Sequence, residues 1–218
     1  GHGVPGIPDQ CRGAVLLAPI MKRLRLIVGL LGALAASPGY CLPPLQPLID
    51  ATPAGGVLRP PPGTYAGPAA ITHPITLDGE GKVTVDGGGQ GTVLGVHVNG
   101  ATVRGLHLTS SGASHDAVDA GLLLEANDVL IENNVIDDVL FGIHLKAANR
   151  NTIRGNRITS KPIDLNLRGD GVRLWYSRFN LIEGNEITGV RDLTFANSAD
   201  NHIVGNTVRE GRYGMQFI

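Results

Sequence analysis

Aromatic residues, cysteine and methionine are scarce in this sequence. Phe, Trp and Tyr together make up 4% of the 218 residues, and the chain holds 2 cysteines and 2 methionines. A large globular core built on Phe and Trp is therefore not expected, and two cysteines exclude a thiolate-rich metal site. Glycine is abundant instead, with 31 residues. That composition favours stacked small aliphatic side chains joined by many tight turns.

The chain also lacks an excess of positive charge. Its formal net charge is −1, and without residues 1–36 it holds 14 basic and 18 acidic residues, which is a net charge of −4. A protein that binds nucleic acid usually offers a basic surface to the phosphates. We therefore expect no nucleic-acid partner.

The apolar run over residues 26–36 is shorter than the stretch of about 20 residues that a transmembrane helix needs. It follows the basic stretch 21–25 and contains small residues around Ala35, which is the pattern of a secretory signal peptide. We predict a signal peptide over 21–36 and export of the chain; a short membrane anchor is the alternative. Residues 1–20 precede Met21 and are interpreted as an upstream extension.

From Gly121 onward the chain repeats itself about every 21 or 22 residues. Each unit holds a short alternating strand, a turn with Asn or Ser, and a second strand of the pattern I-x-x-N-x-I. Such a unit cannot bury its apolar face alone and must stack on a copy of itself. The repeat therefore predicts an all-β solenoid. The units are 121–136, 142–158, 171–187 and 192–208, and a fifth begins at Gly214 and is cut off at Ile218.

The rest of the chain departs from this pattern. Residues 37–70 are rich in Pro, Gly and Ala, and we predict that they form an N-terminal cap with one short amphipathic helix over 45–52. The repeats are predicted to fill 71–218. Residues 109–120 and 159–170 lengthen their rungs, and such insertions form loops on one side of a solenoid, which is often its binding side.

The period of two within each strand predicts which side chains share a face. The inward positions are Ile143, Leu145, Val172, Leu174, Met215 and Phe217. The outward positions form one column of Leu123, His144, Arg173, Thr194 and Gln216, and a second column of Glu125, Lys146, Trp175 and Ala196.

One asparagine recurs in each I-x-x-N-x-I strand, at Asn134, Asn156, Asn185 and Asn206. Identical amides stacked at the strand spacing of about 4.8 Å hydrogen-bond along the stack. Asparagine also tolerates the left-handed backbone that a sharp turn needs. We therefore interpret this column as a structural ladder without a catalytic role.

Metal binding is the first candidate for chemistry. The chain offers scattered histidines, and His107, His144 and Met215 are the candidate ligands, a set that would suit copper. Neither an HxxxH nor a CxxC spacing is present. The alternative is that these histidines are isolated surface residues.

Carbohydrate chemistry is the second candidate. Paired carboxylates could act on a glycosidic bond, with Arg173 or Lys146 holding an anionic sugar and Trp175 and Tyr176 stacking on a ring. The alternative is that the carboxylates are turn residues. We predict that the binding face carries Asp116, Arg173 and Trp175. The candidate carboxylates are Asp116, Asp119, Asp137, Asp138 and Asp170.

Several longer runs are more specific than the generic repeat. On these runs the chain resembles the NosD family, the periplasmic maturation proteins of nitrous oxide reductase, from about Cys41 to its end. The repeat alone is similar to the broader carbohydrate-binding and sugar-hydrolase type of β-helix. The runs are PAGGVLRPPPGTYAGPAAITHPITLDGEG (53–81), SHDAVDAGLLLE (114–125), VIDDVLFGIHLK (135–146), GDGVRLWYSRFNLIEGNEITGVRD (169–192) and GNTVREGRYGMQF (205–217).

The resemblance implies a right-handed parallel β-helix of the pectin-lyase-like kind and a periplasmic location. It implies an accessory component rather than an enzyme, one that supports assembly of the copper–sulfide centre of nitrous oxide reductase and has copper as its only expected cofactor. The implied partners are the membrane permease and the ATPase of an ABC-type system, with a copper chaperone and nitrous oxide reductase beside them. Family members continue for several more rungs, so we interpret the chain as a fragment.

Two other functions share the predicted fold. One is a secreted polysaccharide lyase, hydrolase or epimerase, and the other is a structural solenoid without a ligand. Fold alone does not choose between them.

Overall fold

A computed structural model describes residues 41–218. The predicted upstream extension (1–20) and signal peptide (21–36) lie outside the described residues. Within the described part, no helix is long and apolar enough to cross a membrane.

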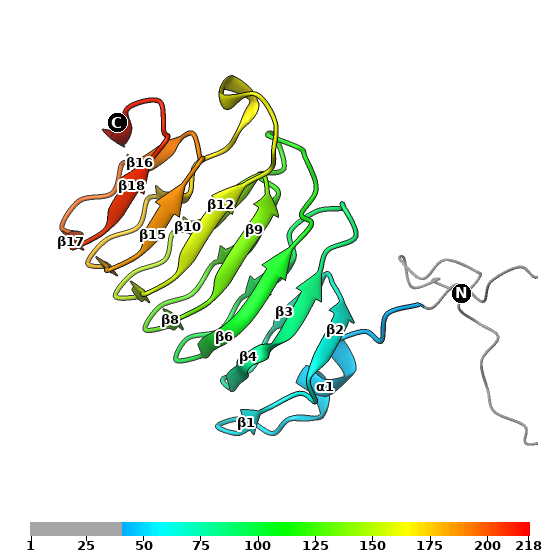
Figure 1. Cartoon of the computed structure of the whole chain (residues 1–218). Helices are drawn as coiled ribbons and strands as arrows, with labels where there is room; N and C mark the ends of the chain where they lie inside the picture. The colour runs from blue at the N-terminus through cyan, green and yellow to red at the C-terminus, as the bar shows by residue number, and fades with distance from the viewer. Residues whose placement is uncertain (1–40) are drawn as a thin grey trace, which may run out of the picture. The chain divides into compact units, whose positions relative to one another are not determined.

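The described chain is a stack of short parallel strands that form two sheets, one of 12 strands and one of seven. Figure 1 shows successive rungs lying side by side from β2 and β4 to β17 and β18. Equivalent residues of neighbouring rungs face each other in register, for example Ile143 with Val172 and Ile153 with Ile182. The predicted solenoid is therefore confirmed as a parallel β-helix.

The seven-stranded sheet takes one strand from each rung. In spatial order its strands are β19 (Gly214–Phe217), β16 (Asp192–Ala196), β13 (Val172–Trp175), β10 (Phe141–Lys146), β7 (Ala120–Leu124), β5 (Leu94–Val96) and β3 (Ala69–Ile71).

The 12-stranded sheet takes two strands from each later rung and is joined through the long strand β6 (Thr102–Thr109), which pairs with both sets. One set comprises β8 (Leu130–Glu132), β11 (Thr152–Arg154), β14 (Leu181–Glu183) and β17 (His202–Val204). The other set comprises β9 (Val135–Val139), β12 (Arg157–Ser160), β15 (Glu186–Thr188) and β18 (Thr207–Arg209). On the N-terminal side of β6, β4 (Thr76–Asp86) pairs with β1 (Val57–Leu58) and β2 (Gly63–Ala66).

The I-x-x-N-x-I segment differs from the single strand that the sequence predicted. In each rung it forms two short strands with a sharp bend between them. The residue before the ladder asparagine has a positive φ of 54–63°, at Asn133, Gly155, Gly184 and Gly205. Gly adopts this backbone without steric cost and Asn at low cost, which explains why the position is Asn in one rung and Gly in the other three.

The interior of the helix is a continuous aliphatic core. Ile143, Leu145, Val172 and Leu174 are all 0% exposed, as their inward assignment predicted. Burying one such side chain contributes about 1.5–3 kcal/mol, so stacking of rungs is the main source of stability. Met215 and Phe217 continue the inward column on β19 but are 37% and 67% exposed.

Asparagine side chains connect the rungs at the bend after the first short strand. The Nδ2 atom of Asn134 donates to Oδ1 of Asn156 at 3.0 Å, Asn156 donates to Asn185 at 3.0 Å, and Asn185 donates to Asn206 at 2.8 Å. Each Nδ2 also donates to a backbone carbonyl of the preceding rung, as in the bond from Asn156 to Ile131. A second ladder, not foreseen from the sequence, runs through Asn151, Asn180 and Asn201.

The N-terminal segment contains the predicted helix as α1 (Gln46–Ala51). Leu45 and Ile49 at this helix are fully buried in the core, and the Gln46 side chain accepts from the backbone N–H of Ala70 at 2.7 Å. Strand pairing begins at Val57 in β1, ahead of residue 71, from which the repeats were predicted.

Candidate functional site

The outer face of the seven-stranded sheet carries the two predicted columns. His144 pairs with Leu123 on one side and with Arg173 on the other, and Arg173 pairs with Thr194. In the second column Lys146 pairs with Trp175. The sheet therefore places polar and aromatic side chains from consecutive rungs side by side.

The loop of the first lengthened rung lies against this face, and it touches the loop of the second. His115 in the first loop donates from Nε2 to the carbonyl of Leu167 in the second loop at 2.9 Å. Val118 and Ile163, one from each loop, pack on a small buried cluster of Ala120, Leu140 and Phe141. Figure 1 shows both connections at the same end of the rungs, after β6 (green) and after β12 (yellow).

A pocket of about 260 Å³ lies between the first loop and the sheet. It brings together the three residues of the predicted binding face and one of the predicted metal ligands, His144. Its lining comprises Asp116, Ala117, Val118, Leu123, His144, Lys146, Arg173 and Trp175.

His144 is the most deeply buried polar residue of the pocket, at 5% exposure, and its Nε2 atom has no hydrogen-bond partner. Burial lowers the pKa of His144 to about 4, and the positive charges of Arg173 and Lys146 act in the same direction, against a smaller opposing effect of Glu125. The imidazole is therefore neutral at pH 7.

Arg173 lies beside His144 and is held by aromatic rings. Its guanidinium carbon is 5.5 Å from the centre of the Phe141 ring and 5.7 Å from that of Trp175. Its Nε atom is buried without a hydrogen-bond partner. Trp175 also meets the exposed Tyr176 edge to face at 5.3 Å.

The rim of the pocket is an ion-pair network. Lys146 Nζ is 2.8 Å from Glu125 Oε1, and His97 Nδ1 is 3.1 Å from Glu125 Oε2. The hydrogen bond from Lys146 holds the pKa of Glu125 below its ordinary value. A second, more open pocket of about 290 Å³ shares Leu123 and extends the hollow past His97 toward Ala70.

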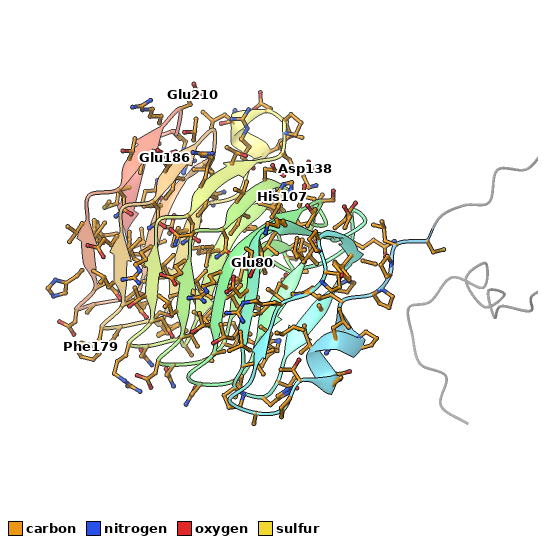
Figure 2. All side chains as sticks on the ribbon, turned by 60° about the horizontal axis from the view of Figure 1, so that its bottom comes forward. Glu80, His107, Asp138, Phe179, Glu186 and Glu210 are labelled. Atoms are coloured by element: carbon orange, nitrogen blue, oxygen red, sulfur yellow. The ribbon has the colours of Figure 1, made fainter. Side chains whose placement is uncertain are left out.

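The three predicted metal ligands do not converge. His107 lies on β6 in the 12-stranded sheet (Figure 2), where its Nε2 is 2.9 Å from Asp137 Oδ2. Met215 follows the inward column through Leu193, so it lies on the face opposite His144 and three strands away, about 14 Å along the stack. Residues 41–218 contain no group of three or more His, Cys, Asp or Glu side chains that could hold a metal ion.

Four of the five candidate carboxylates serve the scaffold. Asp137 bonds to His107, Asp138 (Figure 2) is 3.5 Å from Lys161, and Asp170 is 3.1 Å from Arg191. Asp119 accepts from the backbone N–H of Ser114 at 2.8 Å. Only Asp116 of the five lines the pocket.

Sequence reasoning missed several contributors to this site. Phe141 comes directly before the repeat unit that begins at Gly142, and the guanidinium of Arg173 lies over its ring. Ala117 and Val118 lie in a loop without periodicity. The available signal was the length of the two insertions, which pointed to this side of the helix but not to individual loop residues.

Comparison with known proteins assigns this chain to a family. Residues 81–218 match the model of the right-handed β-helix region. Over 133 residues the chain is 31% identical to the "Probable ABC transporter binding protein NosD" of Pseudomonas aeruginosa, and the match covers 60% of this chain and 31% of that protein. The chain thus spans about a third of the length of this curated relative.

Proposed function

Because this chain belongs to the right-handed β-helix family, we propose that it is an exported accessory component of an ABC-type system. Its role is to support maturation of the copper–sulfide centre of nitrous oxide reductase from the periplasm. It acts through contacts with the permease and the ATPase of that system, and with a copper chaperone and the reductase, rather than as an enzyme.

The observation that carries this proposal is the 31% identity to a protein named as an ABC transporter binding protein. The matched length of 133 residues is several rungs, so the similarity extends beyond one repeat unit. The structure adds a rigid scaffold with one loop-covered face. Such a face suits recognition of a partner or ligand, since loops on a solenoid gather on its binding side.

The predicted copper ligands do not fit a common site. His107 is engaged with Asp137, and His144 and Met215 point to opposite faces of one sheet. We therefore assign no step to copper on this trio; in the proposed system copper is the cargo. Titration of the chain with copper should give the same affinity for His107→Ala and His144→Ala as for the wild type.

Deletion of the gene tests the proposed function. We expect nitrous oxide reductase from the deletion strain to lack the copper–sulfide centre, as measured by copper content and visible absorption, while growth on polysaccharides is unchanged. Restoring the gene should restore the centre. A reductase with its full copper content in the deletion strain contradicts the proposal.

A secreted enzyme acting on polysaccharides is the second candidate, and the pocket with Arg173, Trp175 and Asp116 favours it. Such an enzyme releases new reducing or unsaturated chain ends from an acidic polysaccharide. Release of such ends by the purified chain, abolished in Asp116→Asn, supports this candidate. Absence of release, together with the reductase defect above, favours the accessory role.

A further inference from the structure

The turn between β13 and β14 differs in sequence from the equivalent turns of the neighbouring rungs. The strand pairs on either side of it align Tyr176 with Ala147 and Asn197, and Phe179 with Asp200. The turn has the same length in these three rungs, so the chain makes it with small or polar residues as well as with aromatic ones. The scaffold therefore does not require an aromatic residue at either position.

The backbone at both aromatic positions is left-handed. The φ angle is 50° at Tyr176 and 57° at Phe179, close to the 48° of Asn197 and the 59° of Asp200. Asn and Asp tolerate this region better than bulky residues do, because the Cβ of an L-residue crowds the backbone there. Strain of this kind persists mainly where a function needs the side chain. The two rings are thus placed at a cost that the next rung avoids.

Burial does not offset this cost. Tyr176 is 57% exposed and Phe179 is 59% exposed, and Figure 2 shows Phe179 at the outer edge of the rungs. Trp175, 37% exposed, meets Tyr176 edge to face at 5.3 Å. Aromatic residues make up only 4% of the chain, yet three of them lie within 175–179. We call residues 175–179 the aromatic turn; an exposed apolar cluster of this kind marks an interaction surface.

The charges of the aromatic turn lack partners. The exposed Arg178 makes no ion pair within residues 41–218, whereas Arg150 on the preceding rung bonds to Asp128 through two N–H groups at 2.8 Å. Asp200, exposed beside Phe179 along the stack, makes no ion pair within the same residues either. Exposed rings next to a free guanidinium are the combination that contributes most of the binding energy at protein interfaces.

We propose that the aromatic turn is a docking surface for a folded protein partner, which presents an apolar pocket with a carboxylate opposite Arg178 and a basic group opposite Asp200. The proposal rests on the accessory role above and names the surface through which that role is carried out. A membrane fits less well, because binding to anionic lipids uses a cluster of basic residues. A protein interface buries about 800 Å² on each partner, so the turn forms the centre of a larger contact.

The test measures binding to the partners of the proposed system. The probes are the purified permease–ATPase complex, the copper chaperone and nitrous oxide reductase, each titrated with the purified protein. We expect at least one of them to bind the wild type, and the double variant Tyr176→Asn with Phe179→Asn to weaken that binding at least ten-fold. Asparagine suits both backbone positions, so the thermal midpoint of the variant should equal or exceed that of the wild type. The control Tyr213→Asn, at an exposed tyrosine of another rung, should leave binding unchanged.

A charge reversal tests the expected carboxylate of the partner. Arg178→Glu should weaken the same binding at least ten-fold, because it places like charges opposite each other. The matched control is Arg209→Glu, at an exposed arginine on β18 outside the aromatic turn, which should leave the affinity unchanged. Equal thermal midpoints show that both variants are folded.

Unchanged binding in the double asparagine variant overturns the docking surface and leaves the accessory role standing. Absence of binding between the wild type and all three probes also overturns it, and the gene deletion then decides separately on the accessory role. Two further results would assign the turn to another occupant. One is a blue shift of Trp175 emission with phosphatidylglycerol vesicles, and the other is dimerisation in sedimentation, each being lost in the double variant.

Discussion

The asparagine ladder and the loop-covered pocket bury polar side chains to nearly the same depth but satisfy them differently. Asn156 is 1% exposed and its side chain makes four hydrogen bonds, three with the ladder asparagines Asn134 and Asn185 and one with the backbone carbonyl of Ile131. His144 is 5% exposed and its Nε2 makes none. The two side chains are therefore buried to similar depths. They differ in whether their polar atoms have hydrogen-bond partners.

This difference separates scaffold from site. A buried amide with all its bonds made stabilises the stack and leaves nothing to offer a ligand. A buried imidazole with an unpaired nitrogen costs stability and offers an atom for binding. Four predictions test this contrast, and they follow in order of the size of the expected effect.

Asn156→Ala should lower the free energy of unfolding by about 3 kcal/mol. Truncation removes the acceptor of the Asn134 backbone N–H and side-chain amide and leaves the Ile131 carbonyl without its donor. These groups are buried and water does not easily replace the lost bonds. Urea denaturation at neutral pH measures the change, and a loss below 1 kcal/mol would argue against the ladder as a main element of the scaffold.

Acidification should destabilise the protein through His144. The folded pKa is about 4 and the ordinary value is 6.5, so the unfolded chain binds the proton more readily between these pH values. Stability is complete above pH 6.5 and is lost as the pH falls, by roughly 2 kcal/mol between pH 7.5 and pH 5.

The matched variant for this effect is His144→Leu, which lacks the titrating group but keeps the other histidines. We expect the wild type to lose more stability than His144→Leu over the same pH range in urea denaturation. Parallel pH profiles of the two proteins would contradict the neutral, buried state of this imidazole.

Asn149→Ala should cost only about 1 kcal/mol, because this half-buried asparagine lies at the outer turn, where water can replace lost bonds. Its Oδ1 accepts from the backbone N–H of Arg178 at 2.8 Å, and its Nδ2 donates to Asn127 at 3.2 Å. Thermal denaturation beside Asn156→Ala gives the comparison. An equal loss for both variants would mean that burial does not govern the strength of the asparagine ladders.

The sequence predicted the columns of the β-helix well because a strand repeat fixes register. The pairing of His144 with Arg173 and of Lys146 with Trp175 follows from aligning the rungs, and the structure has these pairs. The second ladder could have been predicted from the same alignment, because asparagine also recurs at matching positions, at Asn151, Asn180 and Asn201.

The sequence did not predict how the outward column is covered. His144 was predicted at an outward position, yet it is only 5% exposed and lines a pocket together with Ala117 and Val118 of the first loop. The sequence of a loop without periodicity does not reveal which residues the loop contacts. Here the loop packs against Phe141, and a hydrogen bond joins His115 to Leu167. For the same reason the sequence predicted that Asp116 and Arg173 lie on the same side of the helix, but not that they line one pocket.

The unfolding free energy of His144→Leu at pH 7.5 tests the contrast between scaffold and site most directly. Leu123 shows that leucine fits this column, and the substitution removes an unpaired buried nitrogen, so we expect a change within about 0.5 kcal/mol or a gain in stability. A loss above about 2 kcal/mol, comparable to that of a satisfied buried amide, would show that His144 belongs to the scaffold and would contradict the account.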